Sequence, residues 1–230
     1  MIITASKLTR TAGLCAIAAG VLYVLVQFIH PHETSANVTT TQWKVTHVLT
    51  VTMAVLALAG ITGMYARQVR QAGLLGLIGY MMYAGCFLAI LAFSFAEALV
   101  LPPIAGEAPQ FVSSVLALST GGALSESVGG SDVVFQFGGV LYLLGGFVFG
   151  IALFRSGVLV RWAAMLLAVG ALITLTVPLL PHAQARLLAL PVGLALTGLG
   201  QSLWRSPAVD APSVPGASRP RSRLASAGAA

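Results

Sequence analysis

Charged residues are scarce in this sequence. Among its 230 residues there are 12 lysines and arginines and 6 aspartates and glutamates, so that only 8% of the chain is charged. A soluble domain carries about a quarter charged residues, because charge covers the surface that faces water. Since 57% of the residues are hydrophobic as well, the composition excludes an ordinary water-soluble domain.

Cysteine is scarce too. Cys15 and Cys86 are the two cysteines, and both stand inside apolar runs. Such a pair builds no disulfide framework, and the sequence has no C-x-x-C metal motif. We interpret both as small packing residues.

Long apolar runs are what the sequence has instead. A helix needs about 20 apolar residues to cross the roughly 30 Å of hydrocarbon in a bilayer, and backbone groups in lipid must pair within their own segment. We therefore predict an all-α polytopic membrane protein, with a six-helix transmembrane bundle in residues 1–205. The first run is expected to be a retained span, because it is too long for a signal-peptide core and no small-x-small cleavage site follows it. The predicted spans are approximately 11–30, 45–65, 74–101, 133–154, 159–180 and 184–204.

The basic residues separate into two groups. Ten of the twelve lysines and arginines fall on one side of the predicted spans, and Lys44 and Arg186 remain on the other. Cytoplasmic loops carry the excess of Lys and Arg, so both termini are predicted to be cytoplasmic. The net charge of +6 is mostly this topology signal, with weak affinity for anionic headgroups. We expect no nucleic acid partner, because no folded basic domain is left to bind one.

Short motifs at the ends of the runs carry a resemblance. The turns "MYARQ" and "LFRSGVLVRWA", with "HPHE" after the first run, are similar to those of six-span integral membrane proteins from high-GC bacteria of the actinobacterial type. The resemblance covers most of residues 11–204. It implies the six-helix fold and a multi-pass location in the bacterial inner (cytoplasmic) membrane, and it brings no activity with it.

Ionisable side chains outside the basic turns gather at the predicted outer ends of the spans. The inner halves of the spans contain none, and a proton or ion path needs polar stations along its depth. A proton-coupled transporter or channel is therefore disfavoured, and a one-sided site open to the outer leaflet remains. The gathered polar groups are Gln27, His30, His32, Glu33, Trp43, His47, Glu97, Asp132, Gln136, His182 and Arg186.

Helical spacing places several of these groups on shared faces. Tyr23, Gln27 and His30 stand at i, i+4 and i+7, the spacing of one helix face. Polar stripes on helices bathed in lipid should point inward, so we predict that the faces converge on an outer-side pocket, aromatic below and acidic at its mouth. The other two stripes are Tyr80, Tyr83, Phe87, Ser94 and Glu97, and then Asp132, Gln136 and Gly139.

From this pocket we derive the candidate site. Glu97, His47 and His30 are the candidate catalytic residues. A structural role remains an alternative for each, because His30 precedes Pro31 and can simply end its helix, Glu97 can form a salt bridge with Arg186 or a histidine, and an aromatic stripe is also typical of a packed core. The candidate substrate-binding residues are Gln27, Trp43, Tyr83, Phe87, Ser94, Gln136 and Tyr142.

Two functions fit this arrangement. One is an enzyme acting on a lipid-like substrate from the bilayer, such as a membrane terpene or prenyl cyclase, with Glu97 as general acid, His47 or His30 returning the proton, and Phe87, Phe93, Phe95 and Tyr83 stabilising a cation. The other is a non-catalytic sensor or accessory subunit that binds a ligand or partner on the outer face. In both, membrane lipids are the surroundings, and the sequence identifies no partner protein.

A metal site is a third, weaker hypothesis. The candidate zinc ligands are His30, His32, Glu33, His47, Glu97 and His182. No H-x-x-x-H or H-E-x-x-H spacing is present, so we assign no metal ligands and expect no cofactor.

The remaining segments lie outside the spans. We expect a short helix in "EAPQFVSSVLALS" within the outer loop 102–131, since Glu107 and Pro109 suit a first turn. That loop is either a lid or disordered. Residues 206–230, rich in Pro, Ser, Ala and Arg, are predicted to form a disordered basic cytoplasmic tail.

Overall fold

The computed structural model describes residues 4–120, 122–179 and 186–206. The described residues form helices and no strand, so the predicted all-α fold is confirmed. Five helical segments are long and apolar enough to cross a membrane, and the chain is a multi-pass membrane protein. They are α1 (Ala5–Ile29), α3 (Thr41–Arg67), the rod from Val69 to Ile104, α7 (Ser131–Ser156) and the segment Arg186–Trp204, whose α-helix is α10 (Ala189–Trp204).

The rod from Val69 to Ile104 is composite. It consists of α4 (Val69–Phe95), a single π-helical turn η1 (Ala96–Val100) and α5 (Leu101–Ile104), and it is longer at both ends than the predicted span 74–101. Gly73, at φ +56°, breaks the first turn of α4, a conformation that glycine adopts without steric cost. A prediction from continuous apolar residues leaves out such ends, so it underestimates the length of the helical rod.

The predicted span 159–180 differs most from the structure. Its α-helix, α8 (Arg161–Ile173), is only 13 residues long, and the chain continues as the 3₁₀ helix η2 (Thr174–Leu179). Pro178 has no N–H to donate to the carbonyl of Thr174, so the α-helical ladder ends there. Residues 180–185 lie outside the described residues, and with them His182.

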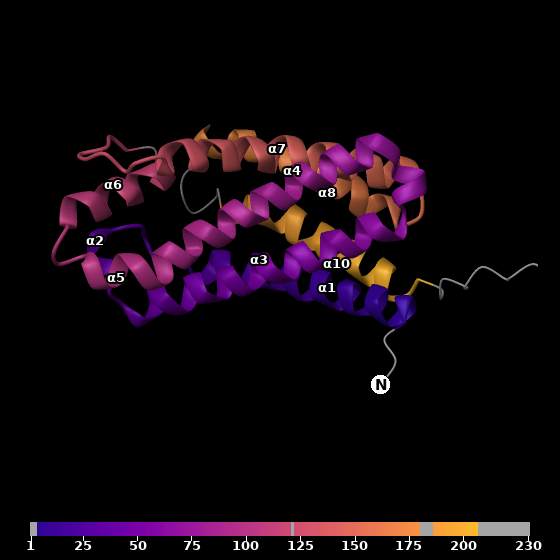
Figure 1. Cartoon of the computed structure of the whole chain (residues 1–230), viewed down its shortest axis with the longest axis horizontal. Coiled ribbons are helices and arrows are strands. Elements are labelled where there is room, and N and C mark those ends of the chain that lie inside the picture. The colour runs from indigo at the N-terminus through magenta and orange to yellow at the C-terminus, as the bar shows by residue number, and fades with distance from the viewer. Residues whose placement is uncertain (1–3, 121, 180–185, 207–230) are drawn as a thin grey trace, which may run out of the picture.

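Six helices of the described residues form a closed ring. In order around it α1 packs on α3, α3 on α4, α4 on α7, α7 on α8, α8 on α10, and α10 back on α1 (Figure 1). Between them lies a continuous core that includes Tyr83, Phe87 and Phe149. The outer surface is apolar as well: Leu74 is 71% exposed and Phe28 64% exposed. A ring that is apolar inside and outside is suited to lipid.

Glycines close the ring between α1 and α10. A Cβ atom on Gly20 would lie 2.4 Å from the carbonyl oxygen of Gly193, and one on Gly13 would lie 2.6 Å from the backbone nitrogen of Trp204. Small residues let helix backbones approach this closely in lipid. These contacts make α1 and α10 antiparallel, so that residues 5 and 204 lie at the same end of the bundle (Figure 1). On α7 a Cβ atom on Gly139 would meet no atom within 4 Å, so this glycine makes no such close contact.

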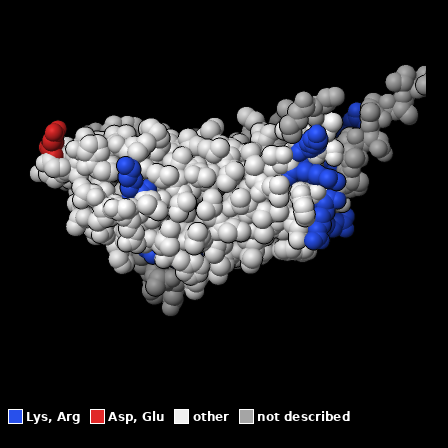
Figure 2. Space-filling view, turned by 90° about the horizontal axis from the view of Figure 1, so that it is seen from below, with Lys and Arg blue, Asp and Glu red and all other residues white. Residues whose placement is uncertain are grey.

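The two ends of the bundle differ in charge. We call the end with the start of α1 the basic end, because Figure 2 shows lysine and arginine gathered there. We call the other the acidic end, although Lys44 and Arg186 also lie on it. The helix ends place Arg67, Arg70, Arg155, Arg161 and Arg205 at the basic end, and all five described carboxylates, Glu33, Glu97, Glu107, Glu126 and Asp132, at the acidic end.

A small cap covers the acidic end. It consists of α2 (Ser35–Val38), α5 and α6 (Pro109–Thr120), which confirms the helix expected after Glu107. Trp43 of α3 is buried with Val38, Leu101, Val112 and Leu116 in a second hydrophobic cluster. The cap thus has a core of its own, joined to the bundle through Trp43.

Candidate functional site

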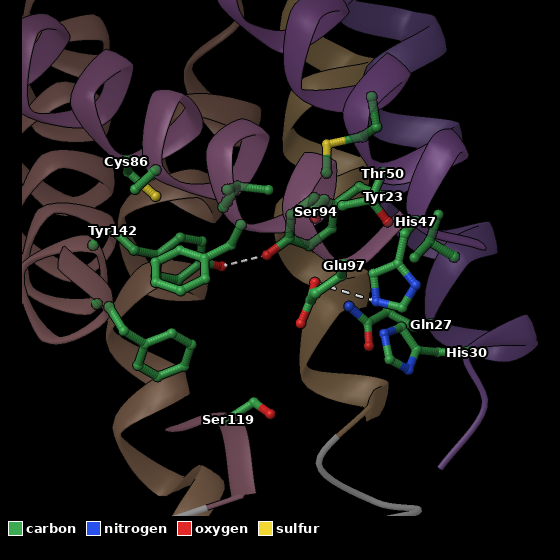
Figure 3. Close-up of a pocket in the computed structure, with 18 of the residues that line it drawn as sticks. Tyr23, Gln27, His30, His47, Thr50, Cys86, Ser94, Glu97, Ser119 and Tyr142 are labelled. Atoms are coloured by element: carbon green, nitrogen blue, oxygen red, sulfur yellow. Dashed lines mark hydrogen bonds and ion pairs between the residues drawn. The ribbon is translucent and has the colours of Figure 1, made fainter. Parts of the chain in front are cut away.

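A cavity of about 390 Å³ opens at the acidic end, between α1, α3, α4 and α7 (Figure 3). Ser119 of α6 lies at its mouth. Its wall is mostly apolar, and the rings of Phe93 and Phe135 meet in it at 90° with centroids 5.5 Å apart. The polar groups of the lining are Tyr23, Gln27, His30, Glu33, His47, Thr50, Ser94, Glu97, Ser119 and Tyr142.

Local sequence places the key side chains at this cavity. Pro31 ends α1, and His30 is its extended C-cap residue at φ −66° and ψ 121°. The side chain of Thr40 starts α3 by accepting a hydrogen bond from the backbone N–H of Trp43. His47 lies one helical turn after Trp43. Glu97 lies in the π-helical turn η1. Such turns rotate the following side chains relative to a regular helix and are frequent at functional sites.

His47 and Glu97 form the centre of the site. The Nε2 atom of His47 lies 3.2 Å from Oε2 of Glu97, and Nδ1 of the same ring lies 2.8 Å from the carbonyl oxygen of Trp43. A carbonyl only accepts, so Nδ1 carries a proton. This separation lets Nε2 and the carboxylate share a proton, held either as imidazolium with carboxylate or as imidazole with carboxylic acid.

The two members of the pair differ in exposure. The His47 side chain is 2% exposed and both its nitrogens have partners, whereas the Glu97 side chain is 18% exposed and lines the cavity. Glu97 is the member that a ligand can touch. His47 holds it in place through the contact of Nε2 with Oε2.

Trp43 supports the pair from behind. Its indole N–H donates to the backbone carbonyl of Glu97 at 2.8 Å, and its ring lies 4.2 Å from the His47 ring, centroid to centroid. Trp43 is fully buried and is not part of the lining. The structure thus places it as a support for the His47–Glu97 pair and not as a ligand contact.

His30 stands beside the pair at the mouth of the cavity (Figure 3). Its ring centroid is 5.1 Å from that of His47, and its Nδ1 donates to the carbonyl of Pro31 at 2.8 Å. Nε2 is then the ring nitrogen available to a ligand. Burial lowers the pKa of His30 below its ordinary value of 6.5, so at pH 7 the ring is neutral and can accept a proton.

Tyrosines bound the deep side of the cavity. Tyr23 of α1 donates its hydroxyl hydrogen to the hydroxyl of Tyr142 of α7 at 3.0 Å, bridging two helices that are not neighbours in the ring (Figure 3). A second chamber of about 350 Å³ shares Tyr23, Tyr142 and four other residues with the first. Arg186 lines this chamber and donates to the carbonyl of Gln27 at 3.4 Å. Of the two expected partners of Glu97, a histidine and Arg186, the structure shows the histidine.

The structure separates the predicted site residues into two sets. Glu97, His47, His30, Gln27, Ser94 and Tyr142 all line the cavity. Tyr83 and Phe87 are fully buried in the bundle core, 4.9 Å apart between ring centroids, and do not line it. A stripe at three- and four-residue spacing covers a wide part of a helix surface. The stripe through Tyr83 and Phe87 therefore includes the side of α4 that packs on α7 as well as the side that faces the cavity.

Gln136 was placed wrongly at the pocket by helical spacing. It is exposed and is not part of the lining, which α7 supplies through Val134, Phe135, Gly138, Gly139 and Tyr142. The polar stripe of Asp132 and Gln136 was expected to turn inward. The face of α7 that packs on α4 is fixed instead by Gly145, whose Cβ would lie 2.6 Å from the backbone of Tyr83.

Two contacts of the site were missed by the sequence. Ser119 donates its hydroxyl hydrogen to the carboxylate of Glu33 in a close contact that joins α6 to the segment after α1. Phe135 closes the cavity opposite Phe93. No spacing rule connects Glu33 to Ser119, because Ser119 belongs to the segment 102–131, which folds back over the end of the bundle. The length of that segment was the one available signal.

Among the described residues no three His, Cys, Asp or Glu side chains converge as metal ligands would. His47, Glu97 and His30 are adjacent, but Nε2 of His47 and Oε2 of Glu97 contact each other and are not directed at a common metal position. His182, a further candidate ligand, lies outside the described residues.

Comparison with known proteins gives no relative: no family model, curated protein or solved structure matches the chain.

Proposed function

We propose that the chain is a six-span enzyme of the bacterial inner membrane that moves a proton on a lipid-like substrate, of terpenoid or prenyl type, in the cavity at the acidic end. The described α8 and η2 supply the sixth span, completing the ring. Both termini are cytoplasmic in this proposal, because the basic end carries the arginines that favour that side.

The observation that carries the proposal is the contact of His47 Nε2 with Glu97 Oε2, 3.2 Å apart at the edge of a mostly apolar cavity. An acid–base group needs a ligand within hydrogen-bond reach and a partner that restores its proton. Glu97 faces the cavity, and His47 lies behind it with its other nitrogen fixed by the carbonyl of Trp43.

The step that fits is an isomerisation or cyclisation, in which the substrate gains one proton and loses another. Glu97 in its acid form donates a proton to a carbon–carbon double bond, which leaves a carbocation. The neutral ring of His30 takes a proton from the neighbouring carbon, and the electron pair of that C–H bond forms the new double bond. The pair and His30 then exchange protons, so enzyme and substrate composition are both unchanged.

Aromatic rings support this chemistry where they line the cavity. Phe93 and Phe135 present their rings to it, and a ring face attracts a cation held within about 6 Å. Tyr83 and Phe87 do not take this role, because they are buried in the core, and Phe95 is half exposed on the outer surface. The substrate is expected to enter from the bilayer, where prenyl chains partition.

Deuterium incorporation tests the proposal whatever product is formed. The purified full chain is incubated in D₂O with a panel of prenyl alcohols and prenyl diphosphates, and each lipid is then analysed by mass spectrometry. We expect carbon-bound deuterium with the wild type and a loss of about 100-fold or more with Glu97→Gln. Asp132→Gln is the matched control, a carboxylate of the acidic end outside the lining. If Glu97→Gln and Asp132→Gln incorporated equal amounts of deuterium, Glu97 would not be the acid.

A non-catalytic sensor or accessory subunit is the second candidate, favoured by the contact of Ser119 with Glu33. Both residues line the cavity, and Ser119 belongs to the cap. A ligand that separates them would move α6 and signal its presence. Deleting residues 207–230 distinguishes the two roles, since an enzyme retains its deuterium incorporation whereas a sensor that signals through the cytoplasmic tail loses its output.

A further inference from the structure

A third cavity lies at the opposite end of the bundle, away from the two described above. It measures about 970 Å³ and runs between α1 and α4 over the surface of α3. These two outer helices do not pack on each other, so the groove between them opens toward the surroundings of the bundle. Leu8, Ala12 and Leu58 give it apolar walls, and Arg67 and Arg70 stand at its basic end.

Arg67 is incompletely paired in this groove. Its Nε atom is buried and has no hydrogen-bond partner among the described residues. A guanidinium N–H removed from water without an acceptor is costly. Within the same described ranges every carboxylate lies at the acidic end, so no carboxylate near Arg67 or Arg70 supplies the missing acceptor.

We propose that this groove binds one phospholipid with an anionic headgroup, taken from the leaflet at the basic end. The phosphate oxygens accept from Arg67 and Arg70, and an acyl chain lies along the apolar wall. Basic pockets between membrane helices suit such headgroups, and arginine N–H groups match phosphate oxygens in geometry and charge. The proposal does not depend on the chemistry of the acidic end.

The shape of the groove favours a lipid over a free anion. A free phosphate would use only the two arginines, whereas the groove continues along α1 past Leu8 and Ala12 to Cys15. Leu8, at 65% exposure, and Val69, at 46%, flank its opening. An apolar wall beneath a cationic rim is complementary to an amphiphile with a negative head.

Native mass spectrometry of the full chain tests the proposal. The protein is purified in mild detergent with equal amounts of phosphatidylglycerol and phosphatidylcholine, and the retained lipid is counted. We expect selective retention of phosphatidylglycerol, weakened about 25-fold in the double variant Arg67→Gln/Arg70→Gln, at about fivefold for each arginine. The matched control is Arg155→Gln/Arg205→Gln, which removes the same charge at the same end from exposed positions outside the groove.

Two further measurements separate the headgroup from the chain. Ala66→Trp fills the groove at an exposed lining position and leaves both arginines in place, so it should weaken retention as well. Inorganic phosphate at millimolar concentration should not protect the protein against thermal unfolding as the lipid does. Equal loss in the two double variants, unchanged retention in Ala66→Trp, or equal protection by phosphate would each overturn the proposal.

Discussion

The acidic and basic ends of this bundle use charge in opposite ways. At the acidic end Glu97 and His47 turn inward and neutralise each other beside a cavity, with the imidazole 2% exposed. At the basic end Arg155 and Arg205 are exposed, and among the described residues no carboxylate lies near them. Inward charges need a partner of opposite sign, because lipid and protein screen them poorly. Outward charges at a headgroup surface find partners in water and phosphate.

The comparison predicts a large difference in stability between the ends. Glu97→Ala should lower the free energy of unfolding by about 3 kcal/mol, because it leaves His47 buried without its acidic partner. Arg155→Gln should change it by less than about 0.5 kcal/mol, as an exposed substitution does. Both are measured by SDS titration of the purified protein, followed by far-UV circular dichroism. Similar values for the two variants would remove the distinction between the ends.

A pair of tyrosines sharpens the comparison within the bundle. Tyr142→Phe removes the acceptor of the Tyr23 hydroxyl and should lower stability by about 0.6–1 kcal/mol. Tyr83→Phe is the matched control, since its buried hydroxyl has no hydrogen-bond partner among the described residues. That change should be neutral or stabilising. The same SDS titration measures both, and a larger loss from Tyr83→Phe would show that its hydroxyl has an unrecognised partner.

The smallest expected effect is a shift in titration. The pKa of His30 is lowered by burial from 6.5, so the neutral ring persists in the folded protein at pH values where an unfolded chain is already protonated. The contribution of His30 to stability is therefore complete above about pH 6.5, decreases as the pH falls below it, and levels off once the folded ring is protonated. NMR of ¹⁵N-labelled histidine, with His30→Gln for assignment, measures this directly. A midpoint at or above 6.5 would contradict the burial of the ring.

The fold was largely predictable because lipid constrains the sequence at every position of a span. Apolar length alone located the ends of α3 and α7 to within four residues, and those of α1 to within six. It failed where the backbone departs from a regular helix: at Gly73, at the π-turn around Glu97, and at Pro178, where α8 gives way to η2. The number of spans and their direction across the membrane stay predictions.

The candidate site was predictable in part, for a physical reason visible on α4 and α7. Glu97, His47 and His30 are costly in lipid, so their inward orientation follows from energy alone. Gln136 lies close to the interface and carries no such cost, so the glycine contacts of α7 decide where it points. Ser119 reaches the cavity because the cap folds over it, and Phe135 because of the rotation of α7. Neither cause appears as a periodic pattern in the sequence.

The seam between α1 and α10 has a consequence for biogenesis. These helices are the first and last elements of the ring, separated in the sequence by all the others. At about 5–20 residues per second, α10 leaves the ribosome roughly nine to thirty-five seconds after α1. During that interval Gly13 and Gly20 face lipid or a membrane chaperone. Assembly of the ring therefore ends when α10 packs on α1. In a nascent chain stalled before residue 189 the ring is still open, and the glycines of α1 have no helix packed against them.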